Sequence, residues 1–169
     1  MRERGVLSVI LPEAGSSQIA ALERLIESEA RFGMQGDPIT RLAALIPAVD
    51  GVADNVAARL RLSRRHRDLL GCLARRQPTD SEAAKALAYA EGSECAVGRL
   101  ILEGHDPRPL DGWDVPDLPL KGGEIVARGL AGPDVSKALR EVEARWIAED
   151  FPDRSRVLEL LDAVLAGRD

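Results

Sequence analysis

The strongest candidate for ligand binding is a run of arginines between Arg59 and Arg76, which holds seven arginines and one acidic residue, Asp68. The run spans the end of one expected helix and the start of another, for which Ser63 is the expected N-cap. Cations in the first turn of a helix are disfavoured by the helix dipole, so a cluster there points to an anionic neighbour. That neighbour is either the backbone of RNA or DNA, or acidic side chains from the second half of the chain. The arginines that we expect to contact RNA are Arg59, Arg61, Arg64, Arg65 and Arg67.

The net charge of −5 is spread unevenly along the 169 residues. Residues 1–76 carry 12 basic and 9 acidic side chains, whereas residues 77–169 carry 11 and 19. An acidic total argues against a protein that coats nucleic acid by bulk charge, but it is compatible with a local basic face. Hydrophobic residues make up 45% and charged residues 30% of the chain, which excludes a wholly disordered protein.

The sequence shows no membrane or export signal. No stretch is long and apolar enough to span a bilayer, and the N-terminus lacks the apolar region of a signal peptide. We therefore expect a cytoplasmic protein with no membrane partner.

Motifs for catalysis are absent from the sequence. It has neither a Walker A nor a Gly-x-Gly-x-x-Gly loop, and it has no nucleophile elbow. Asp111, Asp114 and Asp117 recur at three-residue spacing, but they lie in a proline-rich segment, where acids usually cap turns. We therefore assign no catalytic residue, no metal ligand and no cofactor to this chain.

The two cysteines, Cys72 and Cys95, fall inside separate Ala/Leu-rich helical patterns. There is no Cys-x-x-Cys spacing, and neither cysteine neighbours His66 or His105. Structural zinc sites use closely spaced cysteines and histidines, so such a site is not expected here. We expect both cysteines to be small buried apolar side chains.

Helical periodicity runs through almost the whole chain, and no alternating Val/Ile/Thr run indicates a strand. The predicted fold class is all-α, a compact curved array of about eight to ten helices with no sheet. Residues 105–121 contain four prolines and form the expected connector between a helical subdomain of residues 1–104 and a second one of residues 122–169. The clearest expected helix starts are Asp37-Pro38, Ser63, Gly132-Pro133 and Asp153.

A second candidate feature is the stretch from Pro119 to Leu139. Its glycines and Pro133 predict a short helix, a tight turn and then a long helix. The free N–H groups at the start of each helix offer a site for a backbone phosphate. The alternative is a compact helical hairpin whose glycines only permit close packing.

The same stretch resembles the pattern Pro-(Leu/Ile)-x-Gly-x-Asp-Leu-x-x-x-Gly-x-x-Gly-Pro-x-(Val/Ile/Leu)-(Gly/Ser)-x-x-Leu. This pattern lies in the tail of bacterial tRNA nucleotidyltransferases, the CCA-adding enzymes of the class II poly(A) polymerase-like family. Glu124-Ile125 replaces the usual Asp-Leu, and Ser136 stands where glycine is commoner. The likeness covers nearly the whole chain. Its other parts are Gly5-Val6-Leu7, Leu11-Pro12-Glu13, Asp37-Pro38 with Arg41-Leu42-Ala43-Ala44-Leu45, Arg59-Leu60-Arg61-Leu62-Ser63, and Trp146 with Phe151.

The resemblance implies the C-terminal body and tail region of such an enzyme, which grips the acceptor–T arm of tRNA by its backbone. Residues 1–104 would then be the body-like RNA-binding subdomain, and residues 122–169 the tail-like subdomain. The family's catalytic head carries a Gly-Gly-x-x-Arg-Asp loop and an Asp-x-Asp metal pair, and neither is present in this sequence. The resemblance therefore implies no catalysis by this chain alone. Mg and CTP/ATP are expected only in the absent catalytic head, a partner that is either covalent or separate. The residues that the resemblance adds to the expected RNA contacts are Lys121, Gly122, Gly123, Arg128 and Lys137.

Two other functions stay open, a DNA-binding regulator and a helical protein-interaction module. The segment from Val56 to Ser63 resembles the first helix and turn of a helix-turn-helix motif. That turn usually has glycine where Arg61 stands, because the residue there needs a left-handed backbone. The second helix usually buries Val or Ile where Arg67 stands. Both substitutions argue against DNA reading.

Overall fold

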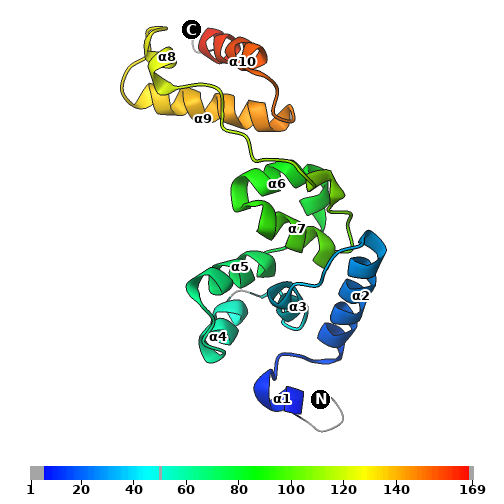
Figure 1. The fold of residues 1–169 in the computed structure, drawn as a ribbon. Helices are drawn as coiled ribbons and strands as arrows, with labels where there is room; N and C mark the ends of the chain where they lie inside the picture. Colours follow the sequence, from blue (N-terminus) through cyan, green and yellow to red (C-terminus); the bar gives the residue numbers. More distant parts are fainter. Residues whose placement is uncertain (1–5, 50, 168–169) are drawn as a thin grey trace. The chain divides into compact units, whose positions relative to one another are not determined.

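The computed structural model describes residues 6–49 and 51–167. These ranges fold into α-helices and short 3-10 helices and contain no strand, which confirms the all-α fold class (Figure 1). The first nine elements are α1 (Val6–Ile10), α2 (Ser16–Phe32), α3 (Pro38–Ala44), α4 (Val52–Arg59), α5 (Arg64–Ala74), the 3-10 helix η2 (Pro78–Ala83), α6 (Ala84–Glu91), α7 (Ser93–Leu102) and the 3-10 helix η3 (Arg108–Leu110). They are followed by α8 (Gly122–Val126), α9 (Pro133–Ala148) and α10 (Arg154–Ala166).

The chain divides into two compact units, the first ending at Trp113 and the second beginning at Asp114. The boundary falls inside the proline-rich segment 105–121 that was expected to connect two subdomains. Leu110 is buried and packs against Ala88 and Leu100, so the first part of this segment belongs to the first unit. Leu120 is buried as well. Leu110 and Leu120 are thus buried, whereas Asp114, Val115 and Asp117 between them are exposed.

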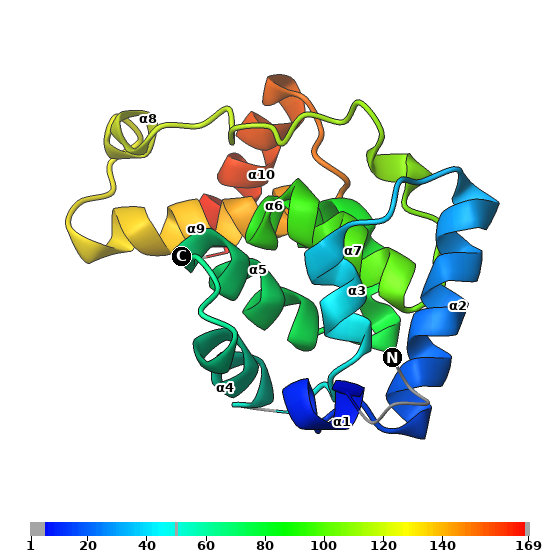
Figure 2. The ribbon, with the colours of Figure 1, turned by 60° about the horizontal axis from the view of Figure 1, so that its bottom comes forward.

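The main core of the first unit lies where α3, α4 and α5 meet. Ala43, Val56, Ala57 and Leu70 are completely buried there, together with Leu73 of α5. Figure 2 shows α3 beside α5, and α4 joined to α5 by a short turn. This core fixes the angle between α4 and α5 and so positions the arginines on the turn that joins them.

Three of the four helix starts predicted from sequence are confirmed by side-chain hydrogen bonds, and the fourth by α9 beginning at Pro133. The Asp37 side chain accepts from the backbone N–H of Thr40 at 2.7 Å, and Ser63 Oγ accepts from that of His66 at 3.3 Å. In the second unit, Asp153 caps α10 in the same way. Each cap satisfies an N–H group that the first turn of a helix leaves without a partner.

A buried ion pair joins η2 to α7 in the first unit. Arg99 Nε and Nη2 each donate to a carboxylate oxygen of Asp80 at 2.7 Å. Both side chains are less than a tenth exposed, at 7% and 8%. A bidentate pair of this kind fixes both distance and orientation between the two elements.

The second unit consists of α8, α9 and α10. Trp146 of α9 is buried, donates from Nε1 to the backbone oxygen of Pro152 at 2.8 Å, and packs edge-on against Phe151. The turn before α9 contains Gly129 and Gly132, which both have positive φ angles, 96° and 58°. The expected short helix, glycine turn and long helix from Pro119 to Leu139 is therefore confirmed.

Candidate nucleic-acid interface

The turn between α4 and α5 has the hydrogen bonds of a common helix C-terminus, but arginine occupies the position that is usually glycine. Arg61 has a φ of 52°, in the left-handed region. Its N–H donates to the oxygen of Ala58, and the N–H of Leu62 donates to the oxygen of Ala57, which together form a Schellman motif. Leu62 packs against the core and anchors the turn. Arginine in this position therefore does not prevent the left-handed turn, so the absence of glycine is no argument against a helix-turn-helix corner here.

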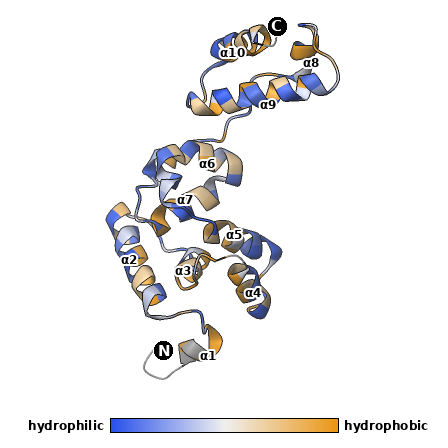
Figure 3. Cartoon of the chain, turned by 180° about the vertical axis from the view of Figure 1, so that it is seen from behind, coloured by the Kyte–Doolittle hydropathy of each residue, from blue (hydrophilic) through white to orange (hydrophobic). Residues whose placement is uncertain are grey.

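Three arginines lie in the first turn of α5, directly after this Schellman turn. Arg64, Arg65 and Arg67 are all exposed, and the side chain of Arg64 is 95% accessible. Its nearest carboxylate is Asp68, at 3.8 Å, and such an exposed pair contributes little energy. Figure 3 shows hydrophilic residues along the turn and the start of α5. The dipole of α5 adds to the positive potential at this end of the helix.

Arg61 and Arg67 form no ion pair with any residue in the ranges 6–49 and 51–167. Both side chains are exposed. The two arginines therefore present charges that no internal carboxylate neutralises within the part of the chain that is described.

The other two arginines of the predicted set have acidic partners. Arg59 Nη2 lies 2.6 Å from Glu13 Oε2, and this hydrogen bond lowers the pKa of Glu13. Arg65 Nη2 lies 3.0 Å from Glu94 Oε2, with the two side chains 75% and 55% exposed. The Arg65 pair is solvated enough to exchange its carboxylate for a phosphate at little cost. Arg59 is held more tightly, so its charge is largely neutralised inside the first unit.

The five residues predicted from the family pattern all lie in the second unit. Lys121, Gly122 and Gly123 stand at the start of α8, and Glu124 Oε1 accepts a hydrogen bond from the Lys121 backbone N–H at 3.1 Å. Arg154 pairs with Glu124 at 2.6 Å and lowers the pKa of its carboxyl group. The backbone N–H of Lys121 at the start of α8 is therefore already bound to a carboxylate of this chain.

Two further cations of this set are paired within the second unit. Lys137 Nζ lies 3.1 Å from Asp134 Oδ1, one turn away on α9. Arg128 Nε lies 3.5 Å from Asp162 Oδ1. The lysine pair is more than half exposed on both sides, so both groups remain accessible to solvent. The two groups of predicted contacts thus lie in different units of the chain.

Sequence reasoning missed that Cys72 and Cys95 are joined by a disulfide between α5 and α7. Both residues are buried, as expected, but they are not independent apolar side chains. Nothing in their spacing of 23 residues marks them as a pair, because helical periodicity gives the buried face of a helix but not its neighbour.

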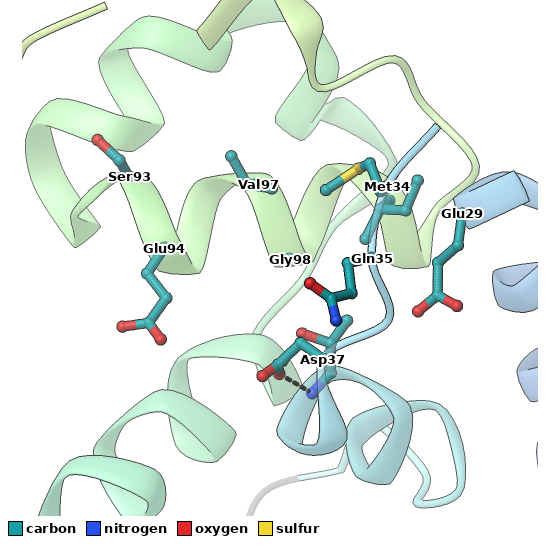
Figure 4. Close-up of a pocket in the computed structure, with 10 residues that line it drawn as sticks. Glu29, Met34, Gln35, Asp37, Ser93, Glu94, Val97 and Gly98 are labelled. Atoms are coloured by element: carbon teal, nitrogen blue, oxygen red, sulfur yellow. Dashed lines mark hydrogen bonds between the residues drawn. The ribbon is translucent and has the colours of Figure 1, made fainter. Parts of the chain in front are cut away.

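A cavity of about 300 Å³ lies between the loop before α3 and helix α7 (Figure 4). Its polar lining includes the carboxylates of Glu29, Asp37 and Glu94, and no basic side chain lines it. The Asp37 carboxylate there is already occupied in capping α3. A cavity with this charge does not suit a phosphate backbone, so we do not include it in the candidate interface.

Comparisons with protein-family models, with curated proteins and with solved structures found no match to this chain. Among the described residues, no helix combines the length and apolar character that a membrane span requires.

Proposed function

We propose that this chain is the tRNA-binding C-terminal region of a CCA-adding tRNA nucleotidyltransferase and serves tRNA 3′-end processing by holding the tRNA. Catalysis then belongs to a separate or covalently attached catalytic head, which would bind Mg and CTP/ATP. Because the proposed ligand of this chain is tRNA, we expect the protein to be cytoplasmic.

The observation that carries this proposal is the set of exposed arginines at the start of α5. Arg61 and Arg67 have no carboxylate partner among the residues described, and Arg64 has only a distant one at 3.8 Å. Arginine forks bind phosphate oxygens bidentately, and RNA helices are recognised mainly through their backbone and shape. A cluster of this kind on a rigid helix–turn–helix corner suits a phosphate backbone better than it suits a protein surface.

The resemblance to the tail of the CCA-adding enzymes supports the same proposal independently. The pattern from Pro119 to Leu139 forms a short helix, a turn with two left-handed glycines, and a long helix that begins at Pro133. Lys121, Arg128 and Lys137 are exposed on this hairpin. Lys121 would add a contact to the RNA backbone directly, and Arg128 and Lys137 would add theirs once their ion pairs with Asp162 and Asp134 open.

A second candidate function is duplex DNA binding by a helix-turn-helix regulator. It is favoured by the left-handed Arg61, since this residue gives the α4–α5 turn the backbone that such motifs need. The exposed Arg67 counts against it, because that position usually packs into the core of the motif. A third alternative, a helical protein-interaction module, has no specific contact in its favour.

Fluorescence anisotropy with labelled tRNA and with duplex DNA of similar charge, across a series of salt concentrations, distinguishes these functions. The proposal predicts tighter binding to tRNA at every salt concentration, with affinity falling steeply as salt rises. Equal or tighter binding to DNA would favour the regulator. Binding to neither nucleic acid at low salt would overturn both and leave the protein-interaction module.

A further inference from the structure

Three side chains that can bind a metal converge in a groove that Arg64 and Arg65 of α5 also line. Cys72 of α5 and Cys95 of α7 form the disulfide, with their Cα atoms 6.2 Å apart. Glu91, at the end of α6, has Oε2 3.2 Å from Cys72 Sγ. The two sulfurs and a carboxylate oxygen of Glu91 all lie within 4.8 Å of one another. Three helices therefore bring two soft sulfur ligands and one oxygen ligand to a single point.

This cluster is reachable from solvent through an open groove of about 660 Å³. Cys72 and Cys95 are only 6% and 3% exposed, so they form the floor of the groove, whereas Glu91 is exposed at its edge. A small ion can therefore reach the sulfurs from the groove.

We propose that the reduced form of this chain binds one thiophilic divalent ion of the Zn²⁺ class through Cys72, Cys95 and Glu91. Zn²⁺ takes thiolate and carboxylate ligands in tetrahedral geometry, and three protein ligands leave its fourth position for water. Two thiolates on one Zn²⁺ lie about 3.8 Å apart, given Zn–S bonds of about 2.3 Å. Side-chain rotation alone can separate the two sulfurs by that much, so the helices need not move.

The charges around the cluster suit such an ion. Two thiolates and the Glu91 carboxylate carry three negative charges, so a divalent ion leaves one negative charge at the site. Arg75 Nη2 lies 3.2 Å from Glu91 Oε2 and can neutralise that remainder. Hydrogen bonds to a ligating carboxylate also fix its orientation, which is the usual role of groups around a metal's direct ligands.

Metal binding and the disulfide are alternative states of the same two sulfurs. A dithiol or phosphine reductant supplies two electrons, the S–S bond breaks, and each sulfur gains a proton. The ion then displaces these two protons as it binds the thiolates. In the reverse direction, the two thiolates give two electrons to a small-molecule disulfide, which takes two protons from water to become two thiols. The Cys72–Cys95 bond forms again and the ion is released.

The test uses the full chain with Co²⁺ as a spectroscopic probe and Zn²⁺ as a competitor. Protein reduced with a phosphine, freed of excess reductant and kept without oxygen, is titrated with Co²⁺, and the absorbance from thiolate-to-cobalt charge transfer is followed. We expect one ion per reduced chain, displacement by Zn²⁺, and no such band with the oxidised chain. Glu91→Gln should weaken binding by about 10-fold or more, since it removes a ligand.

Glu94→Gln is the matched control, because Glu94 lines the same groove but pairs with Arg65 instead of joining the cluster. It should leave the affinity for Co²⁺ unchanged. Absence of the charge-transfer band in the reduced chain would overturn the proposal, as would a stoichiometry of one ion per two chains or equal effects of the two substitutions. Cys72→Ser and Cys95→Ser should each abolish the band. If either variant fails to fold, the proposal is still tested by the wild-type protein, which should show the charge-transfer band when reduced and lack it when oxidised.

Discussion

Arg99 and Asp80 are held face to face in the interior of the first unit, with both pairs of donor and acceptor atoms 2.7 Å apart. Asp80 also accepts a hydrogen bond from the backbone N–H of Gln77 at 2.9 Å, which closes the turn that begins η2. One carboxylate therefore both shapes the 3-10 helix and ties it to α7, the helix that carries Cys95.

Asp80→Asn should strongly destabilise the first unit, because it leaves the Arg99 guanidinium buried without a counter-charge. Removal of one partner from a buried pair costs about 3–5 kcal/mol in the free energy of unfolding. Amide hydrogen exchange in α7 measures the decrease in unfolding free energy of the first unit. Asp68→Asn, which breaks an exposed pair with Arg64, should cost less than about 1 kcal/mol. Similar costs for the two variants would contradict the role given to the buried pair.

Arg61→Gly should have opposite effects on stability and on RNA binding. Glycine adopts the left-handed backbone at this position without strain, so we expect the first unit to gain roughly 0.5–1 kcal/mol in unfolding free energy. The same substitution removes an exposed cation and should weaken tRNA binding. Arg67→Gly is the control, since glycine inside α5 should cost about 1 kcal/mol. Urea unfolding and anisotropy measure the two effects, and a less stable Arg61→Gly variant would exclude strain at this residue.

The double variant Arg64→Glu with Arg65→Glu should bind tRNA more weakly and remain folded. Both side chains are exposed, and so are their acidic partners, Asp68 beside Arg64 and Glu94 beside Arg65, so the loss of stability should stay below about 1 kcal/mol. A variant with Arg24→Glu and Arg140→Glu carries the same net charge and replaces exposed arginines outside the predicted contacts. If both double variants lose affinity equally, the basic cluster has no special role.

A pH dependence follows from the pair formed by Asp106 and Arg108. The hydrogen bond from the Arg108 side chain lowers the pKa of Asp106 from 3.8 to about 2. A carboxyl group with a lowered pKa stabilises the folded state above its unfolded pKa, and this contribution disappears as pH falls through the folded value. The contribution of Asp106 should therefore be lost between about pH 4 and pH 2. NMR titration of its carboxyl carbon gives the pKa directly, and Arg108→Gln should return it toward the ordinary value.

Features set by neighbouring residues could be predicted from the sequence. Asp37, Ser63 and Asp153 cap helices through bonds to N–H groups three residues away, so the pattern itself contains the interaction. Gly33 ends α2 with a left-handed backbone for the same local reason. The all-α class followed from helical periodicity along the chain.

Features that depend on packing between helices could not be predicted. Cys72 and Cys95 are paired across 23 residues, and Arg59 is neutralised by Glu13, which comes 46 residues earlier. No local pattern records which buried faces meet. Arg61 shows a different limit, since a statistical preference for glycine was overridden by the hydrogen bonds and the apolar anchor of its turn.

The salt dependence of tRNA binding tests the central claim most directly. We propose that Arg61 and Arg67, whose charges have no internal partner among the described residues, contact phosphates of tRNA. The slope of log affinity against log salt should therefore be shallower by about 2 in a variant with Arg61→Gln and Arg67→Gln, because each lost phosphate contact reduces it by about 1. Unchanged affinity and slope in that variant, with the fold intact by circular dichroism, would contradict the account.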